Sequence, residues 1–492
     1  MLTKKKIDNY LFKNFSTTKL MYFLSRRMDR FQWFIQKAGI QYKQHQYDGV
    51  QWCLQNELGI GKVRGGIIAD EMGLGKTITA IGLLLTNFMT KTLIVLPNVL
   101  ITQWVFEIQR TTGHKPLVFY GAEKKTITLE QLSSVPIVIT SYSHISVSAL
   151  KVDDPAAAGS MLHMVQWNRV IFDEAHHLRD KNARYWGAKV LASPIKWLIT
   201  GTPIQNKRRD FYNLCSVVGL PASYYTEPDN LNELLDNYVL RRTKLQAGIQ
   251  LPNVELGCNT VNWATEDERV LSEDIHNAIR TADSIERLKL IIKARQTCIL
   301  PALLKKSMQD MVDDNIIPKC DSHVGALSSS SKLDAVLDTL LSRRENGNGK
   351  LIFCHFREEI DMIVSRLKED GVTSLATFDG RTSLNKRAIT LREKVEFLVL
   401  QIQTGCEGLN LQKDFSEVYF VSPNWNPAIE EQAIARCHRI GQVKPVHVFR
   451  FQMTTYQKLE PLVEETVSLS LDQYIQNVQS VKREIIEEII HS

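Results

Sequence analysis

The stretch ADEMGLGKT, Ala69 to Thr77, ends like a nucleotide-binding loop but begins with two acidic residues. The general phosphate-loop pattern has a glycine five positions before Gly-Lys-Thr, and this chain has Asp70 there. A β-branched run (65–70) enters the loop, and a helical pattern, TITAIGLLL (77–85), leaves it. Strand, glycine loop and helix is the context in which this pattern binds phosphate, whereas the plainer alternative is a glycine turn before a core helix.

The residue types in this loop suit a nucleoside triphosphate with Mg²⁺. Gly73 and Gly75 let the backbone curl so that successive N–H groups and the helix N-terminus converge on phosphate oxygens. Lys76 would neutralise the β- and γ-phosphates, and Thr77 would offer its hydroxyl to Mg²⁺. The stretch therefore predicts an ATP site at the end of the first strand.

A second acidic pair lies in VIFDEAH, Val170 to His176. It places Asp173 and Glu174 just past a buried strand, at the edge where open parallel sheets bind ligands. Asp173 would hold Mg²⁺, and Glu174 would take a proton from the attacking water. A lone acidic pair at a strand end is usually a solvated turn, but the loop and the pair together favour a nucleotide site.

Short β-branched runs alternate with helical patterns in two separate blocks. We expect strands at 65–70, 92–97, 136–140, 169–173 and 196–200, and again at 350–354, 374–379, 397–401, 417–422 and 446–451. Near-continuous apolar strands separated by helices predict parallel sheets that are covered on both faces. The predicted fold class is therefore α/β, with two such domains in tandem.

Between the two blocks the composition changes. Residues 266–312 are dense in Arg, Lys, Glu and Leu and predict helices, and a flexible joint is expected at 322–331. Ser331 with Asp334 would then cap an amphipathic helix. The predicted segments are a helical N-terminal extension (1–40), a first lobe (41–230), a helical insertion with linker (231–325), a second lobe (326–455) and a helical tail (456–492).

The bulk properties narrow the class of protein. The 492 residues suffice for about three domains. A net charge of +6, from 60 basic and 54 acidic side chains, permits a polyanionic partner without demanding one. No apolar run approaches the roughly 18 residues that span a bilayer, and the basic N-terminus lacks the apolar core of a secretory signal. Eight scattered cysteines without a CxxC pair indicate a reducing compartment. From the missing apolar run, the missing signal and the cysteines together, we expect no membrane partner and no secretion.

The combination of DEMGLGKT with DEAH resembles the Snf2 family of superfamily 2 helicase-like ATPases, whose loop characteristically begins with these acidic residues. The resemblance implies two RecA-like domains with a helical Snf2-type insertion. It also implies ATP and Mg²⁺ as cofactors, and movement along double-stranded DNA without separation of its strands. The backbone cradle for the phosphates would be Met72, Gly73, Leu74, Gly75, Lys76 and Thr77.

Further motifs extend the resemblance over most of the chain, from Tyr42 to Arg450. YKQHQYDGVQW (42–52) is similar to the segment that reads adenine, with Gln46 at the position of the family's glutamine. LIVLPNVLITQW (93–104) and VITSY (138–142) are similar to the family's DNA-facing motifs. LITGTPIQN (198–206) is similar to the motif that couples ATP hydrolysis to the DNA side. LRRTK (240–244) and ARQTCILPALL (294–304) match family segments around the insertion.

The most specific match is WNPAIEEQAIARCHRIGQ, Trp425 to Gln442, in the second lobe. Arg436 and Arg439 are three residues apart, so we expect them on one helical face, reaching the γ-phosphate as arginine fingers. Gln432, one turn earlier, would share that face and contact the nucleotide. Two arginines at this spacing more often form a solvated helix surface, so the assignment depends on the whole string.

DNA contacts are expected mainly through phosphates. The candidates are Gln103, Thr140 and Ser141 in the first lobe and Gly405 in the loop TGCEGLNLQ (404–412) of the second. This second loop departs from the family pattern, because Gln403 stands where an arginine is usual. The departure bears on DNA contact and coupling, whereas every residue assigned to phosphate chemistry is present.

These observations favour an ATP-dependent double-stranded-DNA translocase that remodels protein–DNA complexes, nucleosomes included, or DNA structures. One alternative is a strand-separating DNA or RNA helicase of the same superfamily, which the HRIGQ ending and the insertion disfavour. Another is a DNA-binding scaffold with a silent ATPase site, which the intact Lys76 and Arg439 disfavour. We expect a monomer with unidentified targeting partners, located in the nucleus, or in a cytoplasmic DNA compartment if it is a short member of the viral type.

Overall fold

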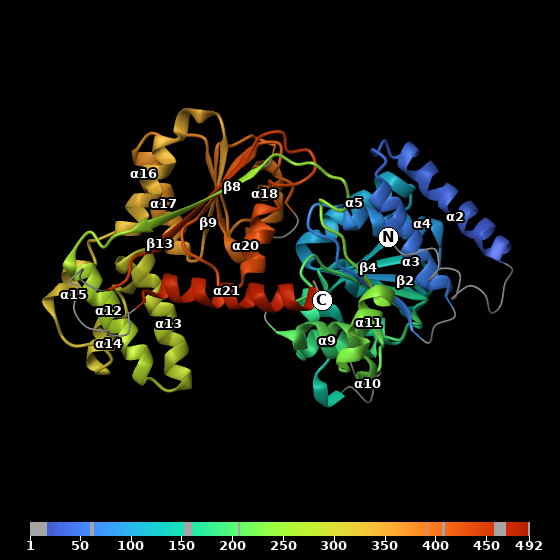
Figure 1. Cartoon of the computed structure of the whole chain (residues 1–492), viewed down its shortest axis with the longest axis horizontal. Coiled ribbons are helices and arrows are strands. Elements are labelled where there is room, and N and C mark those ends of the chain that lie inside the picture. Colours follow the sequence, from blue (N-terminus) through green and yellow to red (C-terminus); the bar gives the residue numbers. More distant parts are fainter. Residues whose placement is uncertain are drawn as a thin grey trace. The chain divides into compact units, whose positions relative to one another are not determined.

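The computed structural model describes residues 17–59, 63–151, 160–204, 207–390, 392–405, 409–456 and 469–490. The chain divides between Gln250 and Leu251 into two compact units. Each unit is built on one parallel β-sheet with helices packed against it (Figure 1). The predicted fold class, two tandem α/β domains built on parallel sheets, is confirmed.

The first unit contains a seven-stranded sheet in the order β3-β4-β2-β5-β6-β1-β7, in which all neighbouring strands are parallel. Its strands are β1 (Arg64–Ile68), β2 (Thr92–Leu96), β3 (Leu117–Phe119), β4 (Ile137–Ser141), β5 (Arg169–Asp173), β6 (Ile195–Ile199) and β7 (Val239–Leu240). Ile199 of β6 pairs with Ile68 of β1 on one side and with Asp173 of β5 on the other. The segments that follow β1, β5 and β6 therefore leave one edge of the sheet side by side.

Apart from the short helix Ala222–Tyr225, the helices of the first unit carry buried apolar side chains. They are α2 (Thr17–Lys37), α3 (Gln44–Leu58), α4 (Lys76–Thr86), α5 (Ile101–Thr112), α6 (Leu129–Ser134), α7 (Tyr142–Ile145), α8 (Ala183–Val190), α9 (Arg208–Val218), α10 (Ala222–Tyr225) and α11 (Leu231–Tyr238). One cluster joins Phe31 of α2, Val50 of α3, Ile81 of α4 and Trp104 of α5 to alternate residues of the strands. Residues 1–16 of the predicted N-terminal extension lie outside the described part, and residues 17–37 form α2.

The second unit contains a six-stranded sheet in the order β10-β11-β9-β12-β13-β8, again with all neighbours parallel. Its strands are β8 (Val254–Val261), β9 (Gly349–Cys354), β10 (Leu375–Phe378), β11 (Phe397–Gln401), β12 (Phe415–Phe420) and β13 (Val446–Met453). All ten strands expected from the sequence are present within a few residues of the predicted bounds. The short β3 and β7 and the edge strand β8 are additional.

The helices of the second unit include those predicted for residues 266–312. They are α12 (Glu266–Thr281), α13 (Ser284–Ile299), α14 (Met308–Asp313), α15 (Asp321–Ala326), α16 (Ser331–Ser342), α17 (Arg357–Glu369), α18 (Leu384–Thr390), α19 (Ile402–Gly405), α20 (Pro427–Ile434) and α21 (Leu471–Ile490). Leu271 of α12 and Cys298 of α13 share one hydrophobic cluster with Val336 of α16 and Ile352 of β9. The helices predicted as an insertion therefore pack within the second unit.

Two local predictions for this region are wrong. The joint expected at 322–331 contains helix α15, where buried His323 lies 2.8 Å from the carboxylate of Asp274. The N-cap of α16 is Ser330, whose hydroxyl donates to Asp334 at 2.7 Å, and Ser331 is the first helical residue. Ser331 instead bonds Glu268 of α12, so a tertiary contact decides the start of the helix.

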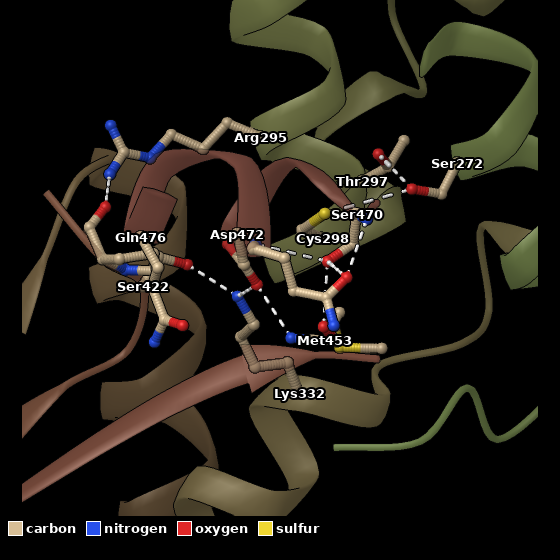
Figure 2. Close-up of polar contacts among 12 residues, drawn as sticks. Ser272, Arg295, Thr297, Cys298, Lys332, Ser422, Met453, Ser470, Asp472 and Gln476 are labelled. Carbon is tan, nitrogen blue, oxygen red and sulfur yellow. Dashed lines mark hydrogen bonds and ion pairs between the residues drawn. The ribbon is translucent and has the colours of Figure 1, made fainter. Parts of the chain in front are cut away.

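The C-terminal helix α21 is anchored to the second unit by a buried ion pair (Figure 2). Lys332 of α16 contacts Asp472 of α21, and neither side chain is exposed to solvent. The Lys332 ammonium also donates to the Ser422 hydroxyl at 2.9 Å, and Asp472 accepts from the backbone N–H of Met453 at 2.9 Å (Figure 2). Of the predicted helical tail, residues 457–468 lie outside the described part, and α21 up to Glu487 belongs to the second unit.

Candidate nucleotide site

Three neighbouring strands of the first unit deliver the predicted nucleotide-binding residues to one sheet edge. β1 leads into the glycine loop, β5 ends at Asp173, and β6, which lies between them, leads into Gly201. A Cβ atom at Gly201 would lie 2.7 Å from Met72 and 3.1 Å from the Lys76 ammonium. The loop and the segment after β6 are therefore in close contact, which only a glycine permits without displacement.

The loop has the backbone that the sequence predicts. Gly73 and Gly75 adopt φ values of +92° and +82°, in the left-handed region that favours glycine. Helix α4 begins at Lys76, whose ammonium donates to the Asp70 carbonyl at 2.9 Å, and half-buried Thr77 lies in the first turn. The start of this helix therefore presents N–H groups, a cation and a hydroxyl together.

Two ion pairs account for the acidic start of the loop. Arg242, in the segment after β7, donates to both carboxylate oxygens of Asp70, at 3.0 and 2.5 Å. Lys244 lies 2.9 Å from the carboxylate of Glu71, which also accepts from the backbone N–H of Lys244 at 2.7 Å. Asp70 and Glu71 therefore tie the loop to residues 242–244, and these partners were not predicted from the sequence.

Gln46 lies against the loop, where the predicted adenine-reading segment should be. Its amide and the ring of His45 both contact the Leu74 carbonyl, at 3.2 and 2.9 Å. The Oε1 atom of Gln46 is buried and has no hydrogen-bond partner among the described residues. An unsatisfied acceptor at this position suits the exocyclic amine of adenine, so the residues present fit the base.

Asp173 is held by side chains from α5 and from the start of α7. The indole N–H of Trp104 donates to its Oδ2 atom at 2.7 Å, and the Tyr142 hydroxyl donates to its backbone carbonyl at 2.7 Å. Burial, followed by the nearby Glu174 charge, raises the pKa of Asp173 to about 7, and the Lys76 ammonium opposes this increase. Two crowded carboxylates beside a cradle of N–H donors are a donor set that suits Mg²⁺ with a polyphosphate.

The neighbouring Glu174 has an unusual backbone. Its φ and ψ of +50° and +49° place a non-glycine residue in the left-handed region, and its N–H donates to Asp173 Oδ1 at 2.9 Å. His176 Nδ1 lies 3.3 Å from the Glu174 carboxylate. Such backbone conformations cost about 1–3 kcal/mol and occur often at functional sites.

In the second unit, the predicted arginines do not lie on a regular helix. Helix α20 ends at Ile434, so Gln432 is helical and buried, whereas Arg436 and Arg439 lie in the turns that follow. The prediction of one helical face is therefore wrong. The backbone carbonyl of Arg436 accepts from the Leu411 N–H at 3.0 Å, and Arg439 contacts the Asn410 side chain, so a loop that precedes α20 in the chain holds these turns.

The two arginines nevertheless concentrate positive charge. Desolvation, together with the nearby Arg436 charge, lowers the pKa of Arg439 to about 10. The Nε atom of Arg436 is buried and has no hydrogen-bond partner in the described part of the chain. At neutral pH both guanidinium groups are charged, and an anionic ligand would relieve their mutual repulsion.

The predicted DNA-contact residues differ in accessibility. Gln103 is half-buried in the first turn of α5. Thr140 is fully buried and its hydroxyl donates to the Phe119 carbonyl at 2.9 Å, so this hydroxyl is not available to DNA. The Ser141 hydroxyl is also buried, 2.8 Å from both Ser143 Oγ and His144 Nδ1. Gly405 ends α19, and residues 205–206 and 406–408 of the neighbouring motifs lie outside the described residues.

The fold and the site together define a nucleotide-binding α/β protein with a second α/β unit. A model of the SNF2-related domain matches residues 45–224, and one of the helicase conserved C-terminal domain matches residues 331–441. The chain belongs to the Snf2 family, and the two models match residues of both units. Within the described ranges, no helix is long and apolar enough to cross a membrane.

Similar proteins include plant and viral members. The ATP-dependent DNA helicase DDM1 of Arabidopsis thaliana is 27% identical over an alignment of 488 positions, and the match covers 87% of this chain and 60% of that protein. The probable global transactivator of Orgyia pseudotsugata multicapsid polyhedrosis virus is 25% identical over an alignment of 450 positions, and the match covers 85% of this chain and 87% of that protein.

One similar solved structure is a Sulfolobus solfataricus SWI2/SNF2 ATPase core in complex with double-stranded DNA. It is 23% identical, and the match covers 92% of this chain and 93% of that one, with a TM-score of 0.38.

Proposed function

We propose that this chain is an ATP-driven double-stranded-DNA translocase that remodels protein–DNA complexes or DNA structures. The observation that carries the proposal is the arrangement in the first unit, where the glycine loop with Lys76 and the carboxylates of Asp173 and Glu174 leave the same edge of the sheet, on either side of β6. Membership of the Snf2 family and the likeness to an ATP-dependent DNA helicase of Arabidopsis support DNA as the partner.

In this proposal the first unit binds the nucleotide. The loop N–H groups and Lys76 hold the phosphates, Gln46 reads the adenine, and Thr77 and Asp173 are the protein ligands for the metal. Mg²⁺, when bound, offsets the charge of the β- and γ-phosphates. Glu174 orients the attacking water and accepts its proton.

Arg436 and Arg439 of the second unit act on the same nucleotide in this proposal. Their charges stabilise the developing charge on the γ-phosphoryl group, and Gln432 also contacts the nucleotide. Binding would bring the two units together and hydrolysis would release them, so that a duplex held by both is advanced stepwise. Gln103 and Gly405 remain the proposed contacts on the DNA side, and Ser141 contributes through its backbone.

The proposal is tested by the steady-state ATPase rate of the purified chain with no nucleic acid, duplex DNA, single-stranded DNA or RNA. We expect duplex DNA to stimulate most, and we expect Lys76→Ala and Arg439→Ala to abolish the stimulated rate. An arginine finger contributes about 10³–10⁵ to turnover in other phosphoryl-transfer enzymes. Arg344→Ala is a matched control, because Arg344 bonds the Asp370 and Gly371 carbonyls on the surface of the same unit.

Other outcomes would select the alternatives. Stronger stimulation by single strands or RNA, with separation of a duplex, would identify a helicase that unwinds its substrate. DNA binding without hydrolysis on any nucleic acid would identify a scaffold with a silent site. The location that follows from the proposal is a compartment that contains cellular or viral DNA.

A further inference from the structure

We infer that Trp104 is a positioning residue for the metal-binding carboxylate of Asp173, an inference that rests on the proposed function. Trp104 lies in the first turn of α5, and its Nε1–H donates to Asp173 Oδ2 at 2.7 Å. The other oxygen, Oδ1, accepts from the backbone N–H of Glu174 at 2.9 Å. Each oxygen thus has one donor from the protein and retains a lone pair for a further ligand.

Burial makes this contact specific. Trp104 is 1% exposed and packs in the core cluster of the first unit, and Asp173 is 7% exposed. An indole ring has one polar hydrogen, so the packing that fixes the ring also fixes the direction of the donor. The plane of the Asp173 carboxylate is therefore set by a rigid core residue and not by solvent.

A second aromatic residue fixes the main chain at the same point. The Tyr142 hydroxyl donates to the backbone carbonyl of Asp173 at 2.7 Å, and Tyr142 is also buried. Trp104 follows β2 and Tyr142 follows β4, the strands that continue the sheet from β5 on the side away from β6. The side chain of Asp173 is thus held from α5, and its main chain is held from the start of α7.

The position of these residues in the chain links the metal carboxylate to the proposed DNA side. Trp104 directly follows Gln103, and Tyr142 directly follows Ser141. Gln103 and Trp104 lie in the same turn of α5. DNA that contacts Gln103 and displaces α5 would therefore also displace Trp104, the hydrogen-bond donor to Asp173 Oδ2. One hydrogen bond would then carry the effect of DNA to the metal ligand.

The test compares Trp104→Phe with Trp167→Phe in the full chain. Trp167 is a matched control, because its indole is fully buried in the same unit and donates to the Leu162 carbonyl at 2.8 Å. The measurement is the fluorescence anisotropy of a fluorescent ADP analogue, without DNA, as Mg²⁺ is titrated. Partners that orient a metal ligand typically contribute about 10–100-fold to metal affinity. We expect the half-saturating Mg²⁺ concentration to rise by this factor in Trp104→Phe alone, with unchanged ADP binding in EDTA.

The outcomes separate this inference from the proposed function. An unchanged Mg²⁺ midpoint in Trp104→Phe, or an equal rise in both variants, would overturn the positioning role. If Trp104→Phe does not fold, a tryptophan analogue with sulfur in place of the N–H keeps the ring and removes the donor, and an unshifted midpoint there overturns the inference too. A wild-type chain without any Mg²⁺-dependent ADP binding would instead contradict the proposed function.

Discussion

Replacing Arg242 by alanine tests whether the acidic start of the nucleotide loop is a structural link. In the structure, 1% of the Asp70 side chain is exposed, and both of its oxygens accept from the Arg242 guanidinium. The variant would leave a buried carboxylate without its cation, and breaking a buried pair in this way costs about 3–5 kcal/mol. Because 16% of the Arg242 side chain reaches solvent, we expect the lower end, about 3 kcal/mol.

Lys244→Ala is the matched control. It removes a cation from the same segment, but its partner Glu71 is 41% exposed. An exposed pair of this kind contributes about 0–1 kcal/mol. The difference between the two variants therefore measures the burial of Asp70 and not the loss of a positive charge.

Thermal unfolding followed by tryptophan fluorescence provides the assay. Trp263 and Trp425 are in the second unit, and the other six of the eight tryptophans are in the first, so the signal reports mainly on the first unit. For a unit of this size 1 kcal/mol corresponds to about 2–4 °C. We expect Arg242→Ala to melt about 6–12 °C below the wild type and Lys244→Ala at most about 4 °C below it. Equal melting temperatures for the two variants would refute the reasoning.

Three further perturbations have expected outcomes. Asp472→Asn leaves the Lys332 ammonium buried without its carboxylate, so the free energy of unfolding of the second unit in urea should fall by about 3–5 kcal/mol. The control Ser480→Ala, on the exposed side of α21, should change this free energy by less than about 0.5 kcal/mol. Gly75→Ala places a side chain at φ +82° with its Cβ in the nucleotide loop, so ADP affinity should fall at least about tenfold in calorimetry while the far-ultraviolet spectrum is unchanged. Desolvation, followed by the charge of neighbouring Arg295, lowers the pKa of His355 well below 6.5. Below about pH 6.5 His355 is therefore protonated in the unfolded chain but not in the native state. The free energy of unfolding then falls by up to about 1.4 kcal/mol per pH unit as the pH decreases. His355→Gln should flatten the fall in melting temperature between about pH 7 and 5.5, and an unaltered slope would contradict the assignment.

The sequence predicted the strands that are buried on both faces. Runs such as 92–97 and 397–401 are apolar except for one terminal polar residue each and form interior strands, whose burial requires that pattern. The edge strand β8, Val254–Val261, was missed because it contains a glycine and several polar residues with exposed side chains. An edge strand has one neighbour and needs less apolar surface, so its pattern is weak.

The nucleotide loop and the carboxylate pair were also predictable, because their residues are close together in the chain. The loop context fixes the local backbone, and the structure has the expected positive φ values at Gly73 and Gly75. The spacing of Arg436 and Arg439 was less informative, since three-residue separation occurs in consecutive turns as well as in a helix. Here a hydrogen bond from Leu411 to the Arg436 carbonyl, not periodicity, accompanies the turns.

Partners that are distant in the sequence could not be predicted. Arg242 is 172 residues from Asp70, and Trp104 is 69 residues from Asp173, so neither contact follows from a local pattern. Helix α21 likewise has no local signal for its role. Its Gln479 donates to Glu430 of α20 at 2.8 Å, across 49 residues of chain. Such contacts depend on strand order, which the sequence alone did not determine.

The central claim, movement along duplex DNA driven by ATP, is tested most directly by displacement of a third strand from a DNA triplex. The wild-type chain is predicted to release the third strand in the presence of ATP and Mg²⁺ while the underlying duplex stays paired. Lys76→Ala and Arg439→Ala should leave the triplex intact although they still bind DNA. A wild-type chain that hydrolyses ATP on duplex DNA without releasing the third strand, or that separates the duplex itself, would contradict the account.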